Sequence, residues 1–301
     1  MKKNFSELIQ SNKILLADGA MGTELFRKGL KYGDCPEEFN LIHPEIIKEI
    51  TESYLEAGAD IIQTNTFGAS PLKLADYNLD DKYIGINSSG VRIAKEVIGN
   101  SAFISASVGP CGKILEPYGD ISASQMKENY RKQIEILIQE GADIICIETM
   151  TDFNEALIVL EVSKTISDKI PVIASMVFEK SENGYFTIMG NSIVDSLSSL
   201  IKNGADMIGS NCGYGILSMI SIAEEFRKFT KHPLIIKSNA GLPHYENNIL
   251  KYSETPDYMA EKIKSLIDIN VNIIGGCCGT TPEYIKSFRK VIDSFLKNSK
   301  S

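Results

Sequence analysis

The chain has 301 residues, of which 43% are hydrophobic and 23% are charged, and its formal net charge is −8. The acidic balance argues against nucleic acid or an anionic membrane as a partner, and no stretch approaches the ~20 apolar residues of a membrane helix. No secretory signal pattern follows the N-terminal lysines, so we expect a cytoplasmic protein whose six cysteines are free, catalytic or metal-bound rather than paired.

A short phrase recurs where a helical pattern gives way to an apolar run. Gly-Ala-Asp-Ile-Ile at residues 58–62 returns at 141–145, then with one substitution at 204–208, and a weaker echo lies at 270–274. Glycine suits the left-handed position that follows a helix, and the apolar run is typical of a strand buried on both faces. We interpret each phrase as a helix-to-strand joint.

Strands and helices are predicted to alternate along the whole chain. In chain order the predicted strands are Ile14–Asp18, Asp60–Thr64, Ala102–Val108, Asp143–Glu148, Pro171–Val177, Asp206–Ser210, Leu234–Ser238 and Val271–Gly275. The predicted helices are Pro44–Ala57, Val91–Ile98, Ser124–Glu140, Asn154–Ile166, Val194–Lys202, Ile216–Phe229, Asp257–Ile269 and Pro282–Phe295. Ser122 or Ser124 can cap the third of these helices.

This alternation allows either an open doubly wound sheet or a closed barrel. Eight units over about 290 residues favour a single (β/α)8 TIM barrel. The segment after the first strand, Gly-Ala-Met-Gly at residues 19–22, does not match a dinucleotide-binding fingerprint. We expect one domain over residues 1–301, with a core at about 12–295.

Three cysteines follow two of the predicted strands. Cys212 comes after the sixth strand, and Cys277 and Cys278 come after the eighth. Barrels of this class carry their active sites at the carboxyl ends of the strands. Three thiolates with an open fourth position match a catalytic zinc site. The alternatives are buried small residues or a strained disulfide between the two adjacent cysteines.

Other polar residues also follow predicted strands. Asp18 and Glu148 each end an apolar run, where a carboxylate suits a substrate ammonium group or serves only as a cap or salt-bridge partner. Asn239 follows the seventh strand as a site residue or a turn amide. Lys237 lies two residues earlier, and Schiff-base lysines occur in such positions, which keeps a lyase as a rival interpretation.

The remaining cysteines and the histidines are not expected to bind the metal. Cys146 alternates inside the fourth strand and is predicted to be a core residue, whereas Cys111 lies near a strand end and Cys35 in an early loop. None of the three histidines follows a predicted strand, which argues against a histidine-based zinc hydrolase.

Several motifs resemble the homocysteine S-methyltransferase family. Gly-Gly-Cys-Cys-Gly-Thr-Thr-Pro-Glu at 275–283 resembles its C-terminal zinc motif, and Asn211-Cys212 resembles the motif of its third ligand. Further matches lie at 18–23, 64–68, 109–110, 148–149 and 239–243, so the resemblance covers about residues 12 to 295. The loop at 34–40 is similar to the homocysteine-binding module of cobalamin-dependent methionine synthase, although Ser238 stands where that branch usually has proline.

The resemblance implies zinc-dependent methyl transfer to homocysteine, giving methionine. It implies that Cys212, Cys277 and Cys278 hold the zinc ion. Asp18 and Glu148 would then hold the ammonium group of the amino acid, and backbone amides near Gly19 its carboxylate. Asn239 would lie against the amino acid or occupy the vacant zinc position.

The methyl donor stays open among several compounds. The resemblance favours a methylcorrinoid such as methylcobalamin. The chain ends at Ser301 without folate, cobalamin or reactivation modules, so we expect the corrinoid on a separate protein. S-Methylmethionine, a betaine and S-adenosylmethionine are the alternative donors. A thiol other than homocysteine, or a non-catalytic zinc or redox module, are further alternatives.

Overall fold

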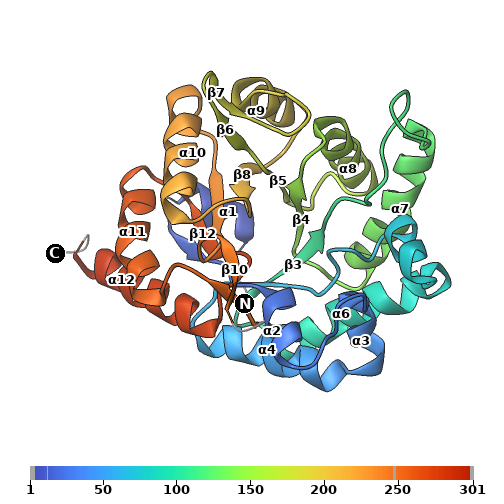
Figure 1. Cartoon of the computed structure of the whole chain (residues 1–301), viewed down its shortest axis with the longest axis horizontal. Coiled ribbons are helices and arrows are strands. Elements are labelled where there is room, and N and C mark those ends of the chain that lie inside the picture. Colours follow the sequence, from blue (N-terminus) through green and yellow to red (C-terminus); the bar gives the residue numbers. More distant parts are fainter. Residues whose placement is uncertain (1–3, 12, 247–248, 299–301) are drawn as a thin grey trace.

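The eight predicted strands form one closed parallel barrel in the computed structural model, which describes residues 4–11, 13–246 and 249–298 (Figure 1). The strands are β1 (Leu15–Leu16), β2 (Ile61–Gln63), β3 (Phe103–Val108), β4 (Ile144–Met150), β5 (Val172–Met176), β8 (Met207–Asn211), β9 (Leu234–Ser238) and β12 (Ile273–Gly276). Each pairs with its neighbours in chain order, β12 pairs with β1, and a bridge between Ala17 and Ile61 joins β1 to β2. The predicted (β/α)8 barrel is confirmed.

Helices surround the strands on the outside of the barrel (Figure 1). The principal ones are α4 (Pro44–Glu56), α6 (Tyr83–Ile98), α7 (Ala123–Gln139), α8 (Phe153–Ile166), α9 (Ile193–Lys202), α10 (Ile216–Phe229), α11 (Pro256–Asp268) and α12 (Pro282–Asn298). Helix α7 begins with a capping box in which Ser122 and Gln125 bond each other's backbone amides. Within the described ranges, no helix combines the length and apolar character needed to cross a membrane.

The sequence prediction differs from the structure mainly in short elements. Helix α6 begins at Tyr83 rather than Val91, because tertiary contacts hold a segment with weak helix propensity. Asn87 in that segment, for example, donates to the carbonyl oxygen of Ala69 at 2.8 Å. Elements that were not predicted are α1 (Phe5–Gln10), α2 (Met21–Arg27), α3 (Phe39–Ile42), α5 (Pro71–Leu74), three short 3-10 turns, and the hairpins β6 (Glu179–Ser181)–β7 (Gly184–Phe186) and β10 (Pro243–Glu246)–β11 (Ile249–Tyr252).

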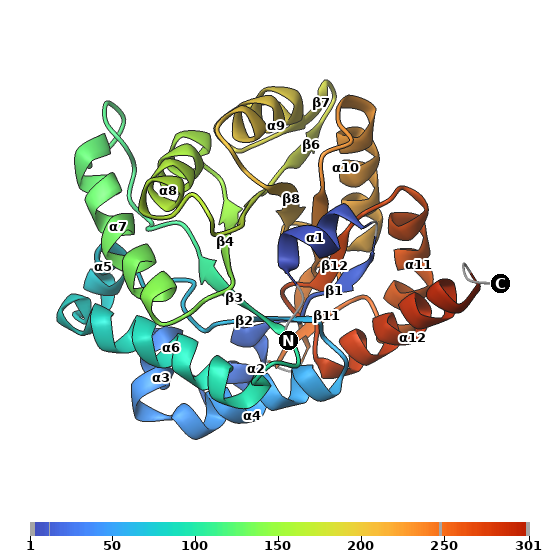
Figure 2. The same ribbon diagram turned by 180° about the vertical axis from the view of Figure 1, so that it is seen from behind.

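The short helix α1 closes the amino-terminal end of the barrel, and in Figure 2 it lies in front of the strands. Phe5 and Ile9 on this helix are buried against the inward-facing residues of the strands. The rings of Phe5 and Phe103 meet edge to face, with centroids 5.3 Å apart. The opposite end, where the strands terminate, is left to the loops that carry the candidate site.

The recurring phrase marks the helix-to-strand joints, as predicted. Its first residue has left-handed backbone geometry each time, at Gly58, Gly141 and Gly204, and Asn270 takes that role in the weaker echo. Its third residue accepts the backbone N–H of the preceding strand through a side-chain oxygen. These bonds are Asp60 to Leu16 at 2.8 Å, Asp143 to Ile104 at 2.6 Å, Asp206 to Val172 at 2.8 Å and Asn272 to Leu234 at 3.0 Å. We call these four side chains the strand clamps.

The barrel interior changes from apolar to polar along its axis. The apolar end is formed by alternate strand residues such as Ile61, Phe103, Ile144, Ile173, Met207, Ile235 and Ile273, together with Cys146. Further along the same strands the inward positions become polar, with Gln63, Ser107, Glu148, Asn211, Lys237 and Cys277. This polar layer is the floor of the candidate site.

Candidate metal centre

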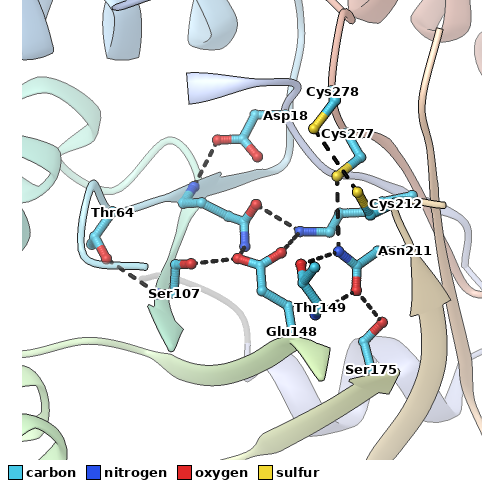
Figure 3. A network of polar contacts seen from close by, with 12 residues as sticks. Asp18, Thr64, Ser107, Glu148, Thr149, Ser175, Asn211, Cys212, Cys277 and Cys278 are labelled. Carbon is cyan, nitrogen blue, oxygen red and sulfur yellow. Dashed lines mark hydrogen bonds and ion pairs between the residues drawn. The ribbon is translucent and has the colours of Figure 1, made fainter. Parts of the chain in front are cut away.

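Three thiol groups meet at the carboxyl ends of β8 and β12 (Figure 3). The Sγ atoms of Cys212, Cys277 and Cys278 all lie within 4.8 Å of one another, and those of Cys212 and Cys278 are 3.9 Å apart. Tetrahedral zinc with Zn–S bonds of 2.3 Å requires sulfurs about 3.8 Å apart. The side chains of Cys212 and Cys277 are half-buried and Cys278 lies toward the solvent, so the group can hold a metal ion and leave one position open. In the part of the chain that the structure describes, this is the only such group.

The backbone around the thiols is held by the neighbouring strand β9. The N–H of Cys212 donates to the carbonyl oxygen of Lys237, and the N–H of Cys277 donates to that of Ser238. The carbonyl oxygen of Cys278 accepts from Ala240 N–H. Cys212 has a φ of +65°, a strained value for a residue other than glycine, as is common at functional sites. Strand β9 therefore sets the spacing of the thiol groups that follow the two strands beside it.

The thiols influence one another's protonation. Hydrogen bonds from Cys277 and Cys278 lower the pKa of the Cys212 thiol. The pKa values of Cys277 and Cys278 are raised, because each shares its proton with Cys212. Without a cation the trio therefore favours one thiolate over three. A divalent metal ion removes this restriction, since thiolate is the form that binds it.

Two predicted site residues present buried oxygen atoms that lack donors. Asp18 is 2% exposed, and its Oδ2 accepts the N–H of Gln63 at 2.7 Å. The Nδ2 of Asn239 donates to the carbonyl oxygen of Gly213 at 3.0 Å. Asp18 Oδ1 and Asn239 Oδ1 are both buried without a hydrogen-bond partner among the described residues. Burial raises the pKa of Asp18 to about 7, outweighing the bond from Gln63.

Gly19 packs directly against the loop that carries two of the thiols. A Cβ atom at this position would lie 2.7 Å from the carbonyl oxygen of Thr280, which shows how closely the two segments approach. The next residue, Ala20, donates its N–H to the same oxygen at 3.0 Å. The segment after β1 and the loop after β12 are thus packed against each other and joined by a hydrogen bond.

Glu148 does not project freely from its strand. It is 5% exposed and forms an ion pair with Lys237, which is 2% exposed (Figure 3). Its other oxygen, Oε1, accepts from Gln63 Nε2 at 2.7 Å and from the hydroxyl of Ser107. Three donors occupy a carboxylate that can accept about four hydrogen bonds, which leaves capacity for one more.

The environment of Lys237 argues against a Schiff-base lyase. Burial alone would lower its pKa, but the carboxylate of Glu148 outweighs this effect and raises the pKa above its usual value. Gln63 Oε1 accepts a further hydrogen bond from Nζ at 2.7 Å. A charged ammonium group that donates to both Glu148 and Gln63 has no lone pair for attack on a carbonyl carbon.

The other three cysteines lie outside the thiol group. Cys35 Sγ lies 3.4 Å from an oxygen of Glu37, and Cys111 Sγ lies 3.3 Å from the sulfur of Met126. Burial raises the pKa of Cys35, Cys111 and Cys146 to about 12. These neutral thiols are poor metal ligands.

Sequence reasoning did not identify the residues that support the site from inside the barrel. Gln63 links Asp18 to Glu148, Ser107 donates to Glu148, and Asn211 contacts Cys277. A signal for Gln63 and Ser107 was available in the sequence. Alternate residues of a strand face the same side, so Gln63 points inward like Ile61, and Ser107 points inward like Phe103. A polar residue at such an inward position of an otherwise apolar strand is the signal.

Comparisons with known proteins agree on one family. A family model described as homocysteine S-methyltransferase matches residues 15–292. The methionine synthase of Mycobacterium tuberculosis (strain ATCC 25618 / H37Rv) is 30% identical over 298 residues, covering 92% of this chain and 24% of that protein. The methionine synthase of Mycobacterium leprae (strain TN) is 30% identical over 296 residues, with the same shares. The chain thus spans about a quarter of the length of these relatives.

Solved structures show the same fold. The metallated form of the homocysteine methyltransferase MmuM from Escherichia coli superposes with a TM-score of 0.79, at 23% identity, covering 96% of this chain and 99% of that one. Its apo form gives a TM-score of 0.73 at 22% identity, covering 96% and 100%.

Proposed function

We propose that this chain, which belongs to the homocysteine S-methyltransferase family, transfers a methyl group to the thiol of homocysteine and forms methionine at a zinc site. Cys212, Cys277 and Cys278 would hold the zinc ion. The observation that carries the proposal is the convergence of three thiols beside two buried oxygens that lack donors. These groups match the two ends of an amino-acid thiol, its sulfur and its ammonium group.

Zinc, when bound, supplies Lewis-acid chemistry that lowers the pKa of a coordinated thiol and favours the nucleophilic thiolate at neutral pH. The protein itself contributes the three cysteine thiolates that would bind the metal ion. Three thiolates place three negative charges at the site, which keeps a neighbouring sulfur electron-rich and suited to attack on a methyl carbon. The half-buried position of the thiols limits competition from water.

The amino-acid end of the substrate would be held by the residues around Asp18. An ammonium group has three N–H donors, and Asp18 Oδ1 and Asn239 Oδ1 are buried acceptors that have no partner in the described part of the chain. Glu148 offers its remaining acceptor capacity, and the ion pair with Lys237 holds its carboxylate in place. The backbone N–H of Gly19 would take the carboxylate of the substrate, since those of Asp18 and Ala20 already donate to Ile61 and Thr280.

We propose a methylcorrinoid, carried by another protein module, as the methyl donor. The relatives that are 30% identical are methionine synthases. Large apolar side chains also remain exposed at the metal-bearing end, on loops and on β10, namely Phe67, Ile114, Tyr118, Ile188, Met189, Tyr214, Leu242 and Tyr245. Exposed apolar groups at the mouth of a site favour a protein-borne donor over a small molecule. A cytoplasmic location follows from the need to keep the thiols reduced.

A methyl-donor screen tests this function. Zinc-loaded protein and homocysteine would be incubated with a methylcorrinoid protein, S-methylmethionine, betaine or S-adenosylmethionine, and methionine formation would be followed. We expect methionine with the methylcorrinoid. Methionine formed only with another donor would move the chain to a different branch of the family, and no methionine with any donor would refute the proposed activity.

A further inference from the structure

Asn211, the last residue of β8, is 1% exposed and uses its side-chain amide fully (Figure 3). Its Oδ1 accepts the backbone N–H of Thr149 at 2.9 Å and the hydroxyl of Ser175 at 2.8 Å. Its Nδ2 donates to Thr149 Oγ1 at 2.7 Å and to Cys277 Sγ at 3.8 Å. Two lone pairs and two N–H groups are the whole capacity of a primary amide.

These partners allow only one orientation of the amide. The backbone N–H of Thr149 can only donate, so it must face the oxygen of Asn211. A flipped amide would place an N–H donor against this donor. The NH2 group is therefore directed at Thr149 Oγ1 and at the thiol of Cys277.

Thr149 is held in a conformation that it would not adopt by itself. Its φ is +58°, a genuine outlier for a β-branched residue, and the register between β4 and β5 shifts at this point. Such strain costs roughly 1–3 kcal/mol and persists only where the surroundings enforce it. Asn211 supplies that enforcement through two hydrogen bonds to Thr149, the residue next to Glu148.

We propose that Asn211 is a positioning residue that joins the Glu148 strand end to the metal centre and weakens Cys277 as a nucleophile. This inference rests on the proposed function. An N–H···S bond withdraws electron density from the sulfur that accepts it. Cys277 would consequently compete less well than the substrate sulfur for a methyl group. The amide thus favours methylation of the substrate over methylation of the protein.

The test uses variants that separate this effect from folding. Asn211→Ala removes all four hydrogen bonds and releases the strain at Thr149. In the double variant Asn211→Ala with Thr149→Gly, glycine adopts a φ near +58° without strain, so folding recovers while the N–H at Cys277 stays absent. Ser175→Ala is the matched control, because it removes one partner of Asn211 but leaves both N–H bonds in place.

Each protein would be loaded with excess zinc and treated with methyl iodide. In this reaction a thiolate sulfur attacks the methyl carbon and iodide leaves with the bonding electron pair. Methylation of each cysteine is then followed by peptide mass spectrometry. We expect Cys277 to react about tenfold faster in the double variant, with Cys212 and Cys278 little changed. Zinc affinity, measured against a competing chelator, should fall by about 10–100-fold.

An unchanged methylation rate at Cys277 in the double variant would overturn the inference, as would an equal increase in the Ser175→Ala control. The proposed function is tested separately, by the zinc content of the wild-type protein and by its methionine formation in the methyl-donor screen. If the wild type binds no zinc, both proposals fail. If it binds zinc and forms methionine while the variants match it at Cys277, only the role of Asn211 is refuted.

Discussion

Lys237 and Glu148 form a buried ion pair across the barrel interior, joining β9 to β4 near the candidate metal centre. Both side chains are almost completely inaccessible to water. Gln63 bonds to both partners, so the pair is part of a network that reaches Asp18. A buried carboxylate with a buried counter-ion keeps a defined orientation, which makes Glu148 a fixed rather than a mobile acceptor.

Replacing Lys237 by Met should destabilise the protein strongly. The substitution leaves the Glu148 carboxylate buried without its counter-ion, and breaking a buried pair in this way costs about 3–5 kcal/mol. Denaturant-induced unfolding measures the change. The double variant Lys237→Met with Glu148→Gln should lose less, because no uncompensated charge remains. Equal losses in the single and double variants would contradict the pairing argument.

Glu148→Gln should increase the homocysteine concentration needed for half-maximal activity, by about tenfold, while zinc stays bound. It should also lower stability, because the buried ammonium group of Lys237 loses its counter-ion. The variant removes a negative charge beside the proposed ammonium site, and charge-assisted hydrogen bonds contribute about 1.5–3 kcal/mol. Steady-state kinetics and zinc content by elemental analysis provide the two measurements. Loss of zinc from this variant would contradict the role assigned to Glu148.

Cys277→Ala should lose zinc and methyl transfer together, while the fold survives. Two thiols alone bind the ion much more weakly than three. The matched control is Cys111→Ala, which removes a buried thiol outside the cluster and should retain both zinc and activity. Circular dichroism confirms folding in each case. An active, metal-free Cys277→Ala protein would refute the metal site.

Binding of the product methionine should strengthen as the pH rises through about 7. The pKa of Asp18 is raised from 3.8 to about 7, so its carboxylate becomes charged, and able to pair with an ammonium group, only above that pH. Methionine avoids the complication of a titrating substrate thiol. Calorimetry over this pH range measures the affinity, and Asp18→Asn should abolish the trend.

The same group affects stability with the opposite sign. In the unfolded chain Asp18 ionises near 3.8, whereas in the folded protein it keeps its proton up to about 7. Between these values the folded state binds more protons, so its stability falls as the pH rises. Asp18→Asn should remove this part of the pH dependence of unfolding.

Asp206→Ala should lower stability by about 1–3 kcal/mol, because it leaves the buried N–H of Val172 without an acceptor. Asp206→Asn should retain most of the stability, since an amide oxygen can accept the same bond. Asn272 already does so at the equivalent joint. Denaturation midpoints of the two variants provide the comparison, and an equal loss in both would contradict the clamp.

The sequence predicted the strand order and the three thiols because these depend on local pattern. Apolar runs after a repeated joint identify strands, and parallel strands place their carboxyl ends together. The partners of Glu148 and Asn211 could not be predicted in this way. They depend on which side chains face each other across the barrel, such as Lys237 and Glu148, which are far apart in sequence and lie on strands that do not pair.

The short elements were missed for a different reason. Helices of four to seven residues such as α2, α3 and α5 have too few turns to give a periodic signal, and their formation depends on tertiary packing. The first turns of α6, which the sequence did not predict, likewise depend on tertiary packing.

The strand clamps also bear on how such a protein can diversify. They recur at every second strand, and all four lie at the amino-terminal end of the barrel, away from the thiols. Neighbouring strands of the barrel are therefore joined by residues that lie away from the candidate site. Loops at the opposite end are free to change their length and partners, so selection can alter what binds there without disturbing the scaffold.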